Sequence, residues 1–299
     1  MKVLRTPDDC FSDLPGYNFE PHYITIQDED GTDLRFHYID EGPHDAEPIV
    51  MIHGNPSWSY LHRKMIPGLL ETGRRVISVD LIGLGRSDKP AHKDDYTLAR
   101  HIDWLTKWML GLDLTNITLF CQDWGGSIGL HLVANHPDRF DRVVAANTGL
   151  PLGEGGNPAL DGWLAMMAEA TAFPWEVFTG AMANNMADDV VAAYRAPFPS
   201  AEYEQGIAKF PVLIAIYEDN EGTPLNRAAW EKLKHFDKPF LTLWGDKDPI
   251  SAGWNKAAQK HIAGCAGQAH ASHPDAGHFI QEEAPDFLVE RISKFLEVS

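Results

Sequence analysis

The sequence has 299 residues, a length that suits one large α/β domain with an insertion or two separate domains. Its net charge of −18 argues against nucleic acid and anionic membranes as partners, and no run of about 18 apolar residues predicts a membrane-spanning helix. The N-terminus lacks the apolar segment of a secretory signal, and the 3 widely spaced cysteines fit a reducing compartment, so we expect a cytoplasmic protein.

The first half of the chain predicts a sheet with strands of two kinds. Residues 1–20 predict an irregular lead-in, and an antiparallel hairpin follows with strands at 22–26 and 34–39. Apolar runs then predict buried strands at 48–52, 75–79, 117–120 and 142–148, separated by helical patterns at 60–70, 98–110 and 127–136. Alternating strands and helices predict a parallel, doubly wound sheet, with the hairpin as its antiparallel edge.

The alternation stops after residue 148 and resumes late in the chain. Between residues 149 and 227 we find helical patterns broken by Gly, Pro and Asn, and no convincing strand. A strand is expected again at 239–244, then a helix near 253–262, a weak strand near 268–273 and a last helix at 285–296. The sequence therefore predicts a core of residues 1–150 and 228–299, with a helical cap at 151–227.

Asp123 stands between a buried strand and a helix, within the run CQDWGG at 121–126. This pattern is typical of a nucleophile elbow, G-x-S-x-G, with Cys121 at the first glycine position and Asp123 in place of serine. A carboxylate that displaces a leaving group from a saturated carbon forms an ester, which water can cleave later, whereas a serine would leave an ether. The run therefore favours attack at an sp³ carbon. The alternative is that Asp123 only caps the following helix.

The elbow, the late helical insertion, a loop with Asp248 and the run AGHF at 276–279 together resemble the α/β-hydrolase fold. In that fold the nucleophile, the acid and the histidine follow in this order, as Asp123, Asp248 and His278 do. Asp246 lies in the same loop, but the family pattern, with a glycine three positions before the acid, falls on Asp248. His273 is the nearby alternative histidine, which we place inside the weak strand.

The runs HGNP at 53–56, GRSDKP at 85–90 and QDWGG at 122–126 are most similar to haloalkane dehalogenases. Epoxide hydrolases share the DWGG run, but they more often have an aromatic residue at the position of Asn55. The resemblance implies that the backbone N–H groups of Asn55 and Trp124 form an oxyanion hole. It also implies that the indoles of Trp124 and Trp163 bind the leaving halide, with Trp175 as the alternative second donor.

The resemblance points to the subgroup with two halide-binding tryptophans, in which the acid follows the strand after the cap. In the sister subgroup the acid follows the earlier strand, where this chain has Asn147 and Thr148 and no carboxylate. The implied reaction is hydrolysis of a haloalkane to an alcohol, a halide ion and a proton. Asp123 attacks the carbon and forms a covalent alkyl ester, and His278, oriented by Asp248, activates water to cleave it.

No metal or cofactor is expected, because the sequence has no H-E-x-x-H and no P-loop, and GLG at 83–85 does not open a Rossmann unit. We expect a small haloalkane as substrate and a monomer or weak homo-oligomer. One alternative is an epoxide hydrolase, which would use cap tyrosines from among Tyr194, Tyr203 and Tyr217. The other is a ligand-binding protein that has kept the fold of a hydrolase.

Overall fold

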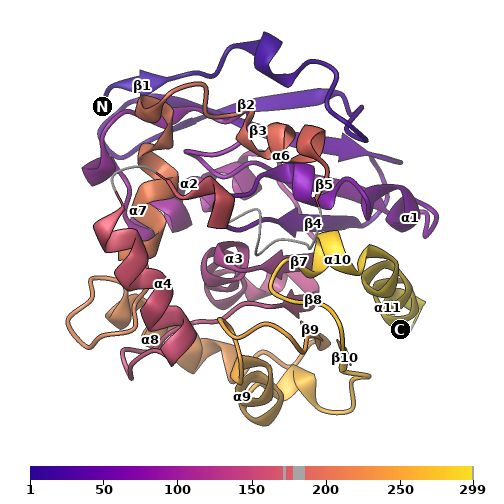
Figure 1. Cartoon of the computed structure of the whole chain (residues 1–299). Helices are drawn as coiled ribbons and strands as arrows, with labels where there is room; N and C mark the ends of the chain where they lie inside the picture. Colours follow the sequence, from indigo (N-terminus) through magenta and orange to yellow (C-terminus); the bar gives the residue numbers. More distant parts are fainter. Residues whose placement is uncertain (171–172, 178–185, 298–299) are drawn as a thin grey trace.

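An eight-stranded sheet runs through the centre of the computed structural model (Figure 1), which describes residues 1–170, 173–177 and 186–297. Its strands are β2 (Pro21–Gln27), β3 (Asp33–Glu41), β4 (Pro48–Ile52), β5 (Arg75–Val79), β7 (Ile117–Gln122), β8 (Phe140–Ala146), β9 (Phe240–Gly245) and β10 (Ala271–His273). They lie in the order β10-β9-β8-β7-β4-β5-β3-β2. The strands from β4 to β10 pair in parallel, and β2 and β3 form an antiparallel edge, which confirms the predicted sheet.

Strands β4, β7 and β9 are buried along their whole length, as expected for parallel strands covered on both faces. Helices α1 (Ile66–Leu70) and α11 (Pro285–Glu297) contact each other, and α3 (Trp124–Asn135) packs between α2 (Leu98–Gly111) and α8 (Thr223–Leu233). These two groups lie apart in Figure 1, with the sheet between them. Within the described ranges, no helix is long and apolar enough to cross a membrane.

The segment between β8 and β9 consists of helices and connecting loops, and its described residues form no strand. It contains α4 (Pro158–Glu169), α6 (Asp188–Arg195), a 3₁₀ turn at Ala201–Glu204, α7 (Gln205–Leu213) and α8. The predicted boundary at 227 falls inside α8, which is joined to α3 by a hydrogen bond of 2.9 Å between His131 Nε2 and Asn226 Oδ1. Residues 171–172 and 178–185 of the predicted cap lie outside the described residues.

The predicted helix at 60–70 is two elements, a 3₁₀ turn at Ser59–His62 and then α1. Proline has no backbone N–H and is favoured in the first turn of a helix, so Pro67 favours a new helix that begins just before it, at Ile66. The lead-in at residues 1–20 is also less irregular than predicted. In it, β1 (Val3–Leu4) pairs with β6 (Lys89–Pro90) across a long sequence separation.

The weak strand predicted at 268–273 is shorter, since β10 begins only at Ala271. The ring of His270 explains this difference, because its Nδ1 accepts a hydrogen bond of 3.1 Å from the backbone N–H of Thr242 in β9. The side chain of His270 thus accepts the hydrogen bond from Thr242 that a backbone carbonyl of a longer β10 would accept. The C-terminal part of the chain then forms α9 (Trp254–His261) before β10, and α10 (Ile280–Glu283) before α11.

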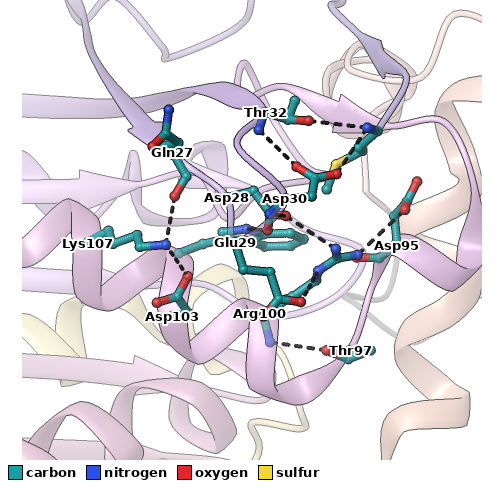
Figure 2. Close-up of polar contacts among 12 residues, drawn as sticks. Gln27, Asp28, Glu29, Asp30, Thr32, Asp95, Thr97, Arg100, Asp103 and Lys107 are labelled. Carbon is teal, nitrogen blue, oxygen red and sulfur yellow. Dashed lines mark hydrogen bonds and ion pairs between the residues drawn. The ribbon is translucent and has the colours of Figure 1, made fainter.

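A polar cluster around Arg100 joins the turn of the β2–β3 hairpin to the start of α2 (Figure 2). Arg100 donates to Asp28 and to Glu29, at 3.2 Å each, and lies 3.5 Å from Asp95. The carboxylate of Asp28 is fully buried and also accepts a hydrogen bond of 2.7 Å from Trp104 Nε1. Arg100 therefore supplies the cation that this buried carboxylate needs.

Replacement of Arg100 by alanine is expected to lower the free energy of unfolding by about 2–4 kcal/mol, because it leaves the charge of Asp28 buried without a cation. Denaturant titration measures this change directly. Lys294→Ala is the matched control, because Lys294 pairs with an exposed carboxylate, that of Glu290, and should change stability far less. Equal effects of the two substitutions would contradict a structural role for the Arg100 cluster.

Candidate active site

Asp123 occupies the sharp turn between β7 and α3, with φ of 52° and ψ of −128°. This conformation is unfavourable for a residue other than glycine and needs support from its surroundings. The support comes from the end of β8, where Asn147 O accepts from Asp123 N at 3.1 Å and Thr148 Oγ1 donates to Asp123 O at 2.6 Å. The side chain of Asp123 makes no capping hydrogen bond in α3, so helix capping does not explain its presence.

Gly125 and Gly54 have no side chain, and this leaves the space that the turn at Asp123 and its carboxylate need. A Cβ atom on Gly125 would lie 2.1 Å from the carbonyl oxygen of Ile52 in β4, so only glycine fits this close approach of α3 to the sheet. A Cβ atom on Gly54 would lie 2.1 Å from Asp123 Oδ1. The glycine of the HGNP run therefore leaves room for the carboxylate of Asp123.

His278 lies between two carboxylates. Its Nε2 is 3.2 Å from Asp123 Oδ2, and its Nδ1 is 3.0 Å from Asp248 Oδ2. Asp248 is buried, whereas Asp246 in the same loop is exposed, and His273 ends β10, where its ring accepts a hydrogen bond from a backbone N–H. The structure thus brings together Asp123, Asp248 and His278, and it does not bring the alternatives Asp246 and His273 into this arrangement.

The charges of the two carboxylates dominate the protonation of His278. Burial lowers the pKa of His278, but the charge of Asp248 and the hydrogen bonds to Asp123 and Asp248 together raise it to about 10. Burial raises the pKa of Asp248, but the opposing effects of His278, Ser251 and Asn147 are larger and hold it well below its usual range. At neutral pH the arrangement is therefore an imidazolium between two carboxylates.

Three residues that we did not predict as part of the site hold this arrangement in place. Asn147 Nδ2 donates to Asp248 Oδ2 at 2.8 Å, and the hydroxyl of Ser251 donates to the same oxygen. Gln122 Nε2 donates to the backbone oxygen of His278 at 2.9 Å. The sequence gives one signal for them, since Asn147 and Gln122 lie at the ends of the strands that also carry the site.

Asn55 lies beside Asp123, and its backbone N–H donates to Asp123 Oδ1 at 2.8 Å. The side chain of Asn55 points elsewhere, because its Nδ2 donates to the carbonyl oxygen of Ile207 at the start of α7. Trp124 is the first residue of α3, where a backbone N–H has no partner within the helix. Both predicted oxyanion-hole residues are thus adjacent to the carboxylate.

An apolar cavity of about 140 Å³ lies over Asp123 and His278 and is lined by both Trp124 and Trp163. Trp175 is not among its described lining residues, and its indole N–H donates to Glu204 Oε1 at 2.9 Å. The described lining also contains none of the three candidate tyrosines: Tyr194 is buried with its hydroxyl on Glu282, Tyr203 is half-buried and Tyr217 is exposed. In the part of the chain that the structure describes, no group of three or more His, Cys, Asp or Glu side chains could hold a metal ion.

Comparisons with known proteins agree with this arrangement. The family model for the alpha/beta hydrolase fold matches residues 47–285. The chain is 47% identical to a haloalkane dehalogenase of Psychrobacter cryohalolentis, over 99% of this chain and 98% of the relative, and 44% identical to one of Mycolicibacterium paratuberculosis, over 98% and 97%. A haloalkane dehalogenase from Paraglaciecola agarilytica NO2, solved as a tetramer, matches with a TM-score of 0.92 and 33% identity, over 100% of both chains.

Proposed function

The chain belongs to the haloalkane dehalogenases, a family with the α/β-hydrolase fold, and from this premise we propose how its residues hydrolyse a carbon–halogen bond. The substrate is a small haloalkane and the products include a halide ion. The observation that carries the proposed roles is that His278 bridges Asp123 and Asp248 at the floor of an apolar cavity that also contains two indoles.

In the first step, a carboxylate oxygen of Asp123 attacks the carbon in line with the carbon–halogen bond. The new C–O bond forms as the C–X bond breaks, and the electron pair leaves with the halide. Aspartate is ionised at neutral pH, so this step needs no base. The indole N–H groups of Trp124 and Trp163 donate hydrogen bonds to the departing halide, and because an indole N–H accepts none, it suits an anion in an apolar cavity.

The first step also prepares the base for the second. Conversion of Asp123 to a neutral ester removes one of the two carboxylates that raise the pKa of His278, so the pKa falls and the imidazolium loses its proton to solvent. Neutral His278, held by Asp248, then takes a proton from water as the water attacks the ester carbonyl of Asp123. The backbone N–H groups of Asn55 and Trp124 stabilise the oxyanion. Collapse of this intermediate breaks the bond between the carbonyl carbon and the alkyl oxygen, which takes the proton of the new carboxyl group and leaves as the alcohol, so that Asp123 is again a carboxylate and His278 keeps the proton from water.

A substrate panel tests the proposed function. Small bromo- and chloroalkanes should give halide and protons in equal amounts, whereas an epoxide control should not be hydrolysed. A haloalkane is favoured over an epoxide as the substrate, because the described cavity lining contains two indoles and none of the three candidate tyrosines. Turnover of the epoxide without halide release from any haloalkane would overturn the proposal.

We further propose that residues 151–227 form the cap and that the rest forms the core. Support comes from α4 and α7, which contribute Trp163 and Pro211 to the lining of the cavity that contains Asp123. Free Cys10, Cys121 and Cys265 fit the proposed cytoplasmic location.

The proposed oligomeric state is a monomer or a weak homo-oligomer. Because one structural relative is a tetramer, light scattering over a range of concentrations is the measurement that decides between these states.

Trp163→Phe is expected to weaken bromide binding to the free enzyme by about 10-fold or more, since it removes one hydrogen bond to a charged ion. Saturable quenching of tryptophan fluorescence by bromide or chloride measures the affinity. Trp175→Phe is the matched control and should change the affinity little, because its indole N–H is hydrogen-bonded to Glu204. A larger effect for Trp175→Phe would show that the assignment of the second halide donor is wrong.

A further inference from the structure

The cavity around Asp123 has a second lobe beside the apolar one. Both lobes contain Asp123, Trp124 and His278. They also share the apolar side chains of Leu160, Ile214 and Ile250. The front lobe is the cavity of about 140 Å³ that contains Trp163. The rear lobe, of about 90 Å³, extends the other way and is lined by Ser127, Thr148, Leu213 and Asn226. It has room for more than one water molecule.

Both lobes are mainly apolar, and the rear lobe has the larger share of polar groups. The residues that line the front lobe alone are Asn55, Pro56, Trp163, Val177, Pro211 and Phe279, and most of them are apolar. The rear lobe carries three hydroxyls, of which that of Ser251 donates to Asp248. Ser127 Oγ donates to Gly149 O at 2.7 Å and Thr148 Oγ1 donates to Asp123 O at 2.6 Å, so each hydroxyl keeps lone pairs that can accept a hydrogen bond from water.

The rear lobe also adjoins the solvent. A surface groove of about 390 Å³ between the start of α4 and the start of α9 shares Pro151, Leu160, Ile250 and Ser251 with it. Asn157 holds the two sides of this wall together, because it accepts hydrogen bonds from the first backbone N–H groups of α4 and donates to Ile250 O at 3.1 Å. The groove and the rear lobe thus lie on either side of one wall, to which Leu160 and Ile250 belong.

We propose that the rear lobe is the water chamber of the enzyme: it binds the water that cleaves the alkyl ester and receives it from the surface groove. This inference rests on the proposed two-step function. After the first step the alkyl group fills the apolar front lobe, so the water needs another place within reach of both His278 and the ester carbonyl of Asp123. The rear lobe is in contact with both residues.

Substitutions that fill the rear lobe test this directly. In Ser127→Leu and Leu213→Phe the halide burst should keep its amplitude, with a rate within about two-fold of wild type, because the front lobe is unchanged. Ester hydrolysis should slow by at least about 10-fold, so that the alkyl enzyme accumulates although His278 is present. Val177→Phe, which fills the front lobe instead, is the matched control: it should slow the burst and accumulate no alkyl enzyme.

Rapid-quench halide measurement and intact-protein mass spectrometry follow the two steps, and thermal unfolding shows that each variant is folded. Leu213 is half-buried, so Leu213→Phe carries the test if Ser127→Leu does not fold. Wild-type ester hydrolysis in the folded rear-lobe variants, or equal slowing of both steps, would overturn the water chamber. The proposed function is judged separately by His278→Phe: if that variant traps the alkyl enzyme, the two-step reaction stands even when the water chamber does not.

Discussion

Asp123→Ala is expected to abolish halide release, with the rate of dehalogenation reduced by at least about 10⁴-fold. In the proposed mechanism the carboxylate of Asp123 attacks the carbon, and no other described carboxylate is in contact with the front lobe. Without it the substrate can still enter the cavity, but the carbon has no nucleophile in line with the leaving halide. Halide release from a bromoalkane, measured over hours to detect slow turnover, gives the residual rate.

Asp246→Ala is the matched control for this experiment, because it removes an exposed carboxylate from the loop that also contains Asp248. Its turnover should stay close to that of wild type. Bromide binding, followed by tryptophan fluorescence, should persist in Asp123→Ala, since both indoles remain. Substantial halide release by Asp123→Ala would mean that another group attacks the carbon.

His278→Phe should separate the two steps of the reaction. The variant is expected to release about one halide per active site in a burst and then to stall, with steady turnover lowered by about 10²–10⁴-fold. A carboxylate needs no base to act as a nucleophile at neutral pH, so the ester should still form, but no base is present to activate water. Stopped-flow detection of halide gives both the amplitude of the burst and the rate after it.

His273→Phe controls for loss of a histidine from the same part of the chain. Its ring lies at the end of β10 and contacts Phe287, so its turnover should remain near that of wild type. Steady turnover of His278→Phe at the wild-type rate would contradict the assignment of the base. Complete loss of the burst would contradict the claim that Asp123 needs no base.

The sheet and the candidate triad were predictable because both depend on simple chain rules. Alternating apolar runs and helices define a parallel sheet, and the carboxyl ends of its strands meet along one edge. Asp123, Asp248 and His278 follow β7, β9 and β10, so the topology alone places them at that edge. Chain order and the CQDWGG run then indicated which aspartates and which histidine form the candidate triad.

The parts that were not predictable depend on contacts between distant residues. Asn147 and Ser251 both bond to Asp248, yet nothing in the local sequence of either residue indicates this partner. The same holds for the pairing of Val3 with Pro90 and for the ring of His270 on β9. The proposed end of the cap, at residue 227, falls within α8, and the hydrogen bond between α8 and His131 of α3 could not be read from the local sequence.

The central claim is that Asp123 forms a covalent alkyl ester, and peptide mass spectrometry of His278→Phe tests it most directly. The variant is mixed with a bromoalkane, quenched in acid and digested, and the peptide that contains Asp123 is sequenced by fragmentation. We predict that the mass of one alkyl group is added in place of one hydrogen, and that fragmentation assigns it to Asp123. An unmodified Asp123 peptide after a full halide burst, or an alkyl group on any other residue, would contradict the account.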